Sequence, residues 1–390
     1  MRASVRKENA MDAPRETTGL QFRSLVSANG ELELSLAAIV IPPPGPDEVV
    51  VRIEAAPINP SDILLMLAGA DPSTMRRAGT TGEARLILDI PPAAFDVVRD
   101  RIGLSLGIGY EAAGTVIAAG ASAAAQALAG RTVAMFAGGM LAHHGLVKAA
   151  DCLLLPEGVT PAEGAAAHVN PLTALGIVET VRREGHAALV HTAAASTVGQ
   201  MLNRICRSDG IEIVNIVRST AQEELLRALG ARHVCNSTAP GFETDLREAV
   251  AATGARIAFD AVGGGRQAGQ ILEAMHAAAS RTMTSYSRYG SAAHKQLYLY
   301  GHLDPGPIVI DRAFGMAWGI AGWAMPSFLA AIGPSEANRL KARVAAEIRT
   351  TFACSFAREI SLSEALLPDN VAAYARLATG EKFLVNPTRG

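Results

Sequence analysis

The chain has 390 residues, enough for two domains of ordinary size, and 49% of them are hydrophobic, so a large core can form. A formal net charge of −2 gives no basic field for nucleic acid or for an anionic membrane. The four cysteines lie far apart without a CxxC pair, so neither a disulfide framework nor a cysteine-rich zinc lobe is expected. These features predict a cytoplasmic protein with no nucleic-acid or membrane partner.

The N-terminal part has the pattern of β-strands. Leu20–Leu36 alternates around Asn29-Gly30, which is typical of a hairpin, and Glu48–Ala56 is rich in valine and isoleucine. The turn at Pro57–Asp62 opens a helix. Residues 71–106 are interpreted as an irregular insertion of loops and short helix that shapes a substrate pocket. Further strands are expected at 107–120, 131–136, 145–147 and 152–156.

From Asn170 onward the pattern alternates between strand and helix. At its centre, a strand at 187–192 leads into the small-residue turn Ala193–Gly199, an amphipathic helix and a second strand at 211–217. A helix N-terminus there offers free N–H groups to a phosphate, and small side chains let a pyrophosphate approach. Further strands are expected at 233–236, 256–261 and 297–300, and helices at 172–181, 221–229, 242–252 and 267–278. This alternation predicts a doubly wound parallel sheet.

Arg218 ends the second strand of this unit, nineteen residues after Gly199. A dinucleotide-binding fold places there the residue that contacts the adenosine ribose. A carboxylate at this position would select NADH, whereas a guanidinium can bind the 2′-phosphate of NADPH. The sequence therefore predicts NADPH as cofactor, with a solvated surface arginine as the alternative interpretation.

Two further segments have unusual composition. Residues 313–335 carry no charge, but Pro326 and the glycines Gly315, Gly319 and Gly322 interrupt them, so a buried helix or subunit contact is expected rather than a membrane span. They predict a homodimer or higher homo-oligomer. Residues 281–296 resemble a phosphate grip, yet they precede a strand, while ligands of open α/β sheets bind at the carboxyl ends. A subunit contact is the better interpretation.

The change of pattern near Asn170 predicts two domains. The first is a β-rich domain at 1–169, completed by 336–390, where a helix near 340–348 and a strand at 383–385 are expected. The second is an α/β cofactor domain at 170–335. No internal repeat is present.

Seven short motifs follow one another in an order that resembles the medium-chain dehydrogenase/reductase superfamily, and more narrowly its zinc-independent quinone oxidoreductase and enoyl reductase branch. The motifs are Ala56–Asp62, Gly109–Val116, Asn170–Ala174, Ala193–Gly199, Leu229–Ala231, Asp260–Gly264 and Tyr300-Gly301.

The resemblance implies a GroES-like β-rich catalytic domain, a Rossmann cofactor domain and hydride transfer from a nicotinamide cofactor to a small molecule. The acceptor would be a quinone, an enone or an enoyl thioester, each polarised by a carbonyl. The family's cofactor contacts map onto Asn59, Asn170, Thr173, Ala194, Ala195, Ser196, Thr197, Val198, Arg218, Val262, Tyr300 and Gly301.

Two departures refine this expectation. Zinc-dependent relatives carry Cys where Asn59 stands and His where Tyr110 stands, so no metal is predicted. Asn59 and Tyr110 become the candidate catalytic residues, with a turn-capping asparagine and a packed aromatic ring as the alternatives. Enoyl thioester reductases have a tyrosine after the glycine that corresponds to Gly69, whereas Ala70 stands here, so that activity has less support. A non-catalytic NADPH-binding protein, for redox sensing or structure, is the alternative function.

Overall fold

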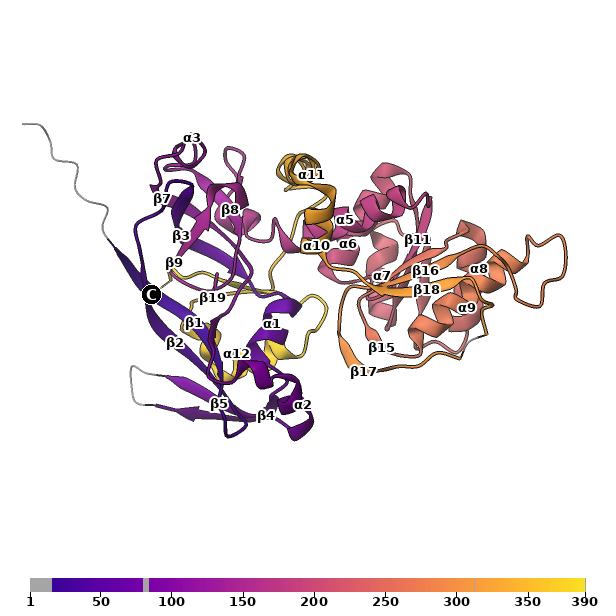
Figure 1. Ribbon diagram of the computed structural model, residues 1–390, viewed down its shortest axis with the longest axis horizontal. Helices are drawn as coiled ribbons and strands as arrows, with labels where there is room; N and C mark the ends of the chain where they lie inside the picture. The colour runs from indigo at the N-terminus through magenta and orange to yellow at the C-terminus, as the bar shows by residue number, and fades with distance from the viewer. Residues whose placement is uncertain (1–15, 80–83, 312, 390) are drawn as a thin grey trace, which may run out of the picture. The chain divides into compact units, whose positions relative to one another are not determined.

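A computed structural model describes residues 16–79, 84–311 and 313–389 (Figure 1). Contacts along the chain divide it into two compact units, one made of residues 1–166 and 356–390 and the other of residues 167–355. The return of the chain to the first unit comes later than the predicted residue 336. The reason is that α11 (Pro334–Ala346) packs against α5 (Val169–Arg183) of the second unit.

The first sheet of the β-rich unit is built on the predicted hairpin. β1 (Thr17–Val26) pairs antiparallel with β2 (Glu31–Ile41) across a turn in which Gly30 has φ +82°. The sheet order is β4-β5-β2-β1-β6. The added strands are β4 (Asp71–Ala78), β5 (Arg85–Asp89) and β6 (Ser105–Gly107). Between β5 and β6 the chain forms α2 (Pro92–Val97) and the 3₁₀ turn η1 (Arg99–Arg101).

The expectation of an irregular insertion at 71–106 is therefore wrong in its main part. β5 alternates as a half-buried strand, with Leu86 and Leu88 buried and Arg85 and Asp89 exposed. β4 has no such alternation in its sequence, which is mostly polar and lies at the edge of the sheet. It is a strand because it pairs antiparallel with β5. Only the short helix α2 agrees with the prediction.

The second sheet of this unit carries the chain's return. β3 (Glu48–Pro57) pairs antiparallel with β7 (Glu111–Ala119) and with β20 (Phe383–Val385), the strand predicted at 383–385. The order is β10-β8-β7-β3-β20-β19, with β9 also on β3. The other elements are α1 (Pro60–Leu67), α3 (Ala123–Gln126), β8 (Thr132–Phe136), β9 (His144–Lys148), η2 (Ala149–Asp151), β10 (Cys152–Leu154), α4 (Pro161–Gly164), β19 (Arg358–Ile360), η3 (Glu364–Leu366) and α12 (Pro368–Ala375). Both sheets contribute to one core, which includes Phe22, Met66 and Phe383.

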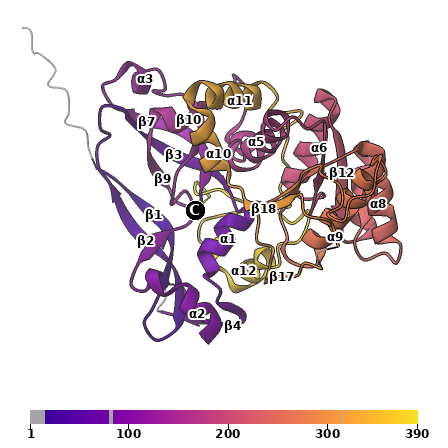
Figure 2. The same cartoon turned by 45° about the vertical axis from the view of Figure 1, so that its right-hand side comes forward.

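The second unit is a doubly wound sheet in which all six strands run parallel, in the order β13-β12-β11-β14-β16-β18. α5 packs on α6, and α8 packs on α9 (Figure 2). The strands are β11 (Ala188–His191), β12 (Glu212–Val217), β13 (His233–Asn236), β14 (Ile257–Asp260), β16 (Lys295–Leu299) and β18 (Trp318–Gly322), with a small ladder of β15 (Gly263–Gly265) and β17 (Asp304–Ile308). The remaining helices are α6 (Thr197–Asp209), α7 (Thr220–Ala228), α8 (Phe242–Thr253), α9 (Gln267–Ser280) and α10 (Met325–Ile332).

The uncharged segment at 313–335 is not one buried helix. It forms the edge strand β18 and then α10, because its glycines and Pro326 break a continuous helical pattern. Trp318 packs edge-on against the buried ring of Phe314, with ring centroids 5.0 Å apart. Among the described residues, no helix is both long and apolar enough to cross a bilayer.

Candidate functional site

The turn after β11 forms a cradle at the N-terminus of α6. The hydroxyl of Ser196 caps the helix and accepts a hydrogen bond from the N–H of Gly199 at 3.2 Å. A Cβ on Gly199 would collide with the carbonyl oxygen of Ala194, so only glycine lets the helix come this close to the turn. The turn itself needs a left-handed residue, and Ala193 takes it with φ +48°.

Cofactor contacts were predicted at five residues of this cradle, 194 to 198, but not all of their N–H groups are free to bind a ligand. The N–H of Ala194 donates to Ile216, and the N–H of Ser196 donates to Ala193. Within the described part of the chain, the N–H groups of Thr197 and Val198 make no hydrogen bond. These two groups begin α6, where the helix dipole favours an anion, so they are the donors that a phosphate would find.

Arg218 lies beside this cradle in the sheet. It directly follows β12, the neighbour of β11, and its side chain is exposed. Its backbone N–H donates to the amide oxygen of Gln222, while its guanidinium has no hydrogen bond or ion pair with any residue that the structure describes. The guanidinium is thus available to an external anion.

Buried polar bonds brace the carboxyl ends of β11 and β14. The hydroxyl of Thr192 donates to Asp260 at 2.7 Å and accepts from the N–H of Ala261 at 2.8 Å. The carboxylate of Asp260 also accepts from the N–H of Val262. Both side chains are completely buried, so they fix the loop that carries Val262, one of the predicted cofactor contacts. The polar Thr192 after an apolar strand was the available signal in the sequence.

Tyr300 follows β16 and bonds to a residue that sequence reasoning missed. Its hydroxyl lies 2.7 Å from Nε2 of His191, and the two rings stack with centroids 5.7 Å apart. Burial lowers the pKa of His191 to about 3, so its imidazole is neutral. The next residue, Gly301, packs so closely on the Ala261 carbonyl that a Cβ would collide with it.

The helix α5 carries the other two predicted contacts of this unit. Asn170 and Thr173 are both buried near its start. The hydroxyl of Thr173 donates to the carbonyl oxygen of Val169 at 2.6 Å, so it can offer a ligand only its acceptor lone pairs.

In the first unit, Asn59 is held from two sides. It is the N-cap of α1, and its backbone N–H donates to Oδ2 of Asp62 at 2.7 Å. Its side-chain nitrogen donates to Oε1 of Glu111 at 2.8 Å. Because Asn59 is 1% exposed, it joins the start of α1 to the start of β7. The capping interpretation is therefore part of its role.

Tyr110 precedes Glu111 and is half-buried. It stacks on Phe136 with ring centroids 6.4 Å apart. Burial raises the pKa of Tyr110, the charge of Asp62 raises it further, and the Arg101 guanidinium opposes both. Arg101 comes from the segment at 71–106 and donates to the carbonyl of Leu65 at 2.7 Å. That segment thus supplies a cation next to Tyr110.

Sequence reasoning missed the buried acids around Asn59. Asp62 and Glu111 have no exposed surface. Burial and the charge of Glu111 raise the pKa of Asp62 to about 7, while the Asn59 N–H and the ammonium of Lys382 lower it. No group of three His, Cys, Asp or Glu side chains suited to a metal ion occurs in the described residues. The arrangement can instead hold a proton near Tyr110.

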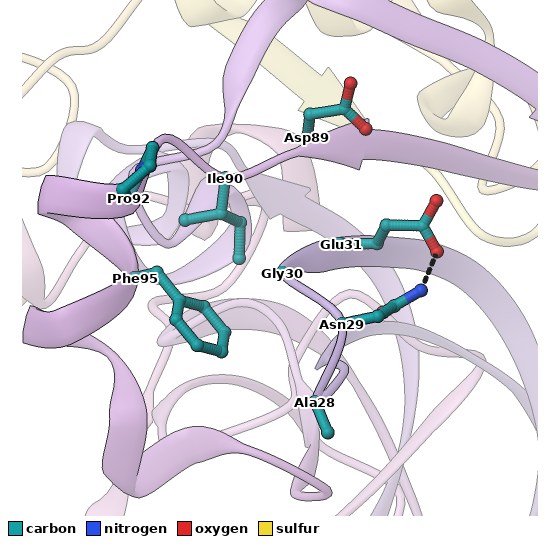
Figure 3. A pocket seen from close by; sticks show the side chains of 8 residues that line it. All are labelled: Ala28, Asn29, Gly30, Glu31, Asp89, Ile90, Pro92 and Phe95. Atoms are coloured by element: carbon teal, nitrogen blue, oxygen red, sulfur yellow. Dashed lines mark hydrogen bonds between the residues drawn. The ribbon is translucent and has the colours of Figure 1, made fainter.

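A hollow lies elsewhere in the first unit, at the β1–β2 turn (Figure 3). Phe95, Ile90 and Pro92 line one side and Glu31 and Asp89 the other, with the side chain of Asn29 donating to Glu31 at 2.8 Å. Arg76 pairs with both acids, so their charge is already compensated. None of the predicted site residues lines this hollow.

Comparisons with known proteins concern the family and the fold of this chain. The family model described as Zinc-binding dehydrogenase matches residues 197–294. The synaptic vesicle membrane protein VAT-1 homolog of Rattus norvegicus is 26% identical over 238 residues, which are 60% of this chain and 51% of that protein. This chain therefore spans about half the length of that relative.

Two solved structures share nearly the whole fold. A candidate NADPH:quinone reductase from Mesorhizobium loti is 25% identical, with a TM-score of 0.70 over 97% of this chain and 100% of that one. The quinone oxidoreductase of Escherichia coli, complexed with NADPH, is 17% identical, with a TM-score of 0.67 over 95% and 100%.

The two units define an α/β protein with a GroES-like β-rich domain and a Rossmann domain, and this confirms the predicted fold class. Residues 197–294 match the zinc-binding dehydrogenase family, and the fold is that of the medium-chain dehydrogenase/reductase proteins, as the order of the motifs predicts.

Proposed function

We propose that this protein transfers hydride from NADPH to a quinone or to the activated C=C bond of an α,β-unsaturated carbonyl, without zinc. The observation that carries the proposal is the cradle at the start of α6, where Gly199 leaves room and the N–H groups of Thr197 and Val198 are free, with the unpaired Arg218 on the next strand. This arrangement fits a dinucleotide with a 2′-phosphate. The NADPH named for the Escherichia coli and Mesorhizobium loti proteins supports the same cofactor.

The Rossmann unit would hold the cofactor and the β-rich unit would act on the acceptor. Bound NADPH supplies the hydride. Thr197 and Val198 would bind the pyrophosphate and Arg218 the 2′-phosphate, with Ala194, Ala195 and Ser196 shaping the turn. Val262, Tyr300, Gly301, Asn170 and Thr173 would contact the nicotinamide half, with Asn59 of the first unit.

Tyr110 is the group suited to polarise the acceptor. Its raised pKa keeps the hydroxyl protonated at neutral pH, so Oη can donate a hydrogen bond to a carbonyl oxygen as negative charge develops there. Asn59 would position it indirectly, because its side-chain nitrogen is already bonded to Glu111, the next residue in the chain. Positioning and polarisation suffice for this chemistry without a covalent intermediate.

The donor set around Asn59 supports a reaction without zinc. Zinc prefers thiolate and imidazole ligands, whereas this position offers an amide nitrogen that donates a hydrogen bond. We expect protein purified without added zinc to contain far less than one equivalent. In the same preparation it should oxidise NADPH with at least one quinone or enone, and strong chelation should leave that rate unchanged.

An NADPH oxidation assay over quinones, enones and enoyl thioesters tests this proposal, with metal analysis of the same sample. Tight NADPH binding without turnover of any acceptor would favour the non-catalytic alternative. Stoichiometric zinc that is lost together with activity would contradict the metal-free mechanism.

The edge strand β18 also supports a homodimer or higher homo-oligomer through residues 313–335. In the described sheet β18 pairs only with β16, and Ala321 and Gly322 are exposed. An open edge is a ready partner for another strand. We expect light scattering at micromolar concentration to give at least twice the monomer mass, and Ala321→Lys to lower it. The control Val97→Lys, on an exposed helix position of the other unit, should leave the mass unchanged. A monomeric wild-type protein would refute this assembly.

A further inference from the structure

The hydrogen-bonded pair of His191 and Tyr300 joins two strands across the carboxyl edge of the Rossmann sheet. His191 ends β11 and Tyr300 follows β16, with β14 between them. Nε2 of His191 and the Tyr300 hydroxyl are 2.7 Å apart, and the rings are stacked. His191 has no exposed surface.

The environment of the imidazole decides which group donates in this bond. Nδ1 of His191 is buried and has no hydrogen-bond partner in the described part of the protein. If Tyr300 donated to Nε2, the neutral ring would carry its proton on Nδ1, as a buried N–H without an acceptor. Each tautomer leaves one donor without a partner in the described protein, either Nδ1–H or the Tyr300 hydroxyl. His191 is completely buried, whereas Tyr300 is only half-buried and its hydroxyl proton can rotate toward a ligand or water, so the unpartnered donor costs less on Tyr300. The favoured tautomer therefore has Nε2–H donating to the tyrosine oxygen.

This tautomer leaves the hydroxyl proton of Tyr300 free to donate elsewhere. Burial raises the pKa of Tyr300, so the proton stays on the oxygen. No second partner of that hydroxyl occurs among the described residues. The ring of Trp323 packs edge-on against the ring of Tyr300, with centroids 6.4 Å apart. The indole N–H of Trp323 donates to the hydroxyl of Thr180. Tyr300 is thus a fixed donor without an acceptor.

The order of strands indicates what this donor meets. Arg218 follows β12 and the α6 cradle follows β11, while Tyr300 follows β16, two strands further in the opposite direction. Adjacent strands are about 4.8 Å apart, so Tyr300 lies roughly 10 Å along the edge from the cradle. A dinucleotide with its 2′-phosphate at Arg218 and its pyrophosphate at the cradle extends its nicotinamide half toward Tyr300.

We propose that His191 is a positioning residue that makes the Tyr300 hydroxyl a hydrogen-bond donor to the carboxamide oxygen of the bound nicotinamide. The inference rests on the proposed binding of NADPH. Tyr300 makes the contact with the nicotinamide, and His191 determines that the tyrosine hydroxyl is the donor in it.

The test compares two ligands by titration calorimetry: NADPH, and 2′-phospho-ADP-ribose, which lacks the nicotinamide ring. Tyr300→Phe and His191→Leu should each weaken NADPH binding about three- to tenfold, the range of one hydrogen bond, and leave the second ligand unchanged. His191→Gln, which keeps an N–H donor, should restore most of the affinity. His191→Leu added to Tyr300→Phe should cause no further loss, because both act through one contact.

Tyr298→Phe is the matched control. Its hydroxyl lies on the same strand but donates to Glu184 at 2.6 Å, so NADPH affinity should not change. Thermal unfolding reports whether each variant folds. If His191→Leu does not fold, Tyr300→Phe and His191→Gln still test the proposal. Wild-type protein that fails to bind NADPH would refute the proposed function itself. NADPH binding that survives both Tyr300→Phe and His191→Leu, or equal losses for the two ligands, would overturn only the role of this pair.

Discussion

Arg218→Ala is expected to weaken NADPH binding about ten- to hundredfold and to leave NADH binding nearly unchanged. Hydrogen bonds to charged groups contribute roughly 1.5–3 kcal/mol, and ~1.4 kcal/mol corresponds to a factor of ten in affinity. The guanidinium is exposed at the end of β12 without a partner in the described protein, so its removal leaves no buried group unpaired. The loss then measures the contact with the 2′-phosphate.

A matched control is Arg232→Ala. Arg232 pairs with Glu212 at the opposite end of the same strand, so its removal changes the net charge equally but far from the cradle. We expect it to leave both affinities unchanged, with fluorescence titration at low and high salt as the measurement. The Arg218 effect should shrink as salt rises, since exposed charges are screened. Equal losses for NADPH and NADH, or none for either, would show that Arg218 does not contact the phosphate.

The helices and strands of the Rossmann unit are predicted well from the sequence, because the residue patterns that indicate them are local. The β-branched run before Arg218 predicts β12 within one residue, and the apolar periodicity from Val198 to Cys206 predicts α6, which begins at Thr197. Which N–H groups of the turn are free could not be predicted, since the N–H of Ala194 is taken by Ile216, a residue on another strand.

The parts that were predicted poorly depend on distant contacts. β4 has no alternation of its own and is a strand only because it pairs with β5. β18 was hidden by glycines that look like helix breaks, yet its register on β16 is continuous over five residues. The hydrogen bond between Asn59 and Glu111 connects residues 52 positions apart in the chain, and no sequence spacing predicts a contact at that separation. His191 was missed because a single polar residue at the end of an apolar strand has many ordinary explanations.

Removal of Asp62 should change the pH dependence of the protein's stability. Asp62 is completely buried beside Glu111, and its pKa of about 7 lies well above its ordinary value of 3.8. Between these two values the folded protein keeps a proton that the unfolded chain releases, so the free energy of unfolding falls as pH rises through this range. At 1.36 kcal/mol per pKa unit, the loss reaches about 4 kcal/mol by neutral pH. The ammonium of Lys382 opposes this rise in pKa but does not cancel it.

Asp62→Asn should remove this loss, because asparagine cannot ionise and its carbonyl oxygen can still accept from the N–H of Asn59. We expect urea unfolding, followed by a probe of the β-rich unit, to show the variant gaining about 3 kcal/mol relative to wild type between pH 5 and pH 8. Taking the difference cancels the opposite slope of the buried histidines His168 and His191, whose pKa values burial lowers to about 3. Asp96→Asn, an exposed acid paired with Arg99, should run parallel to wild type at every pH. If Asp62→Asn also runs parallel to wild type, Asp62 is ionised throughout this range, and the cluster beside Tyr110 does not hold a proton at neutral pH.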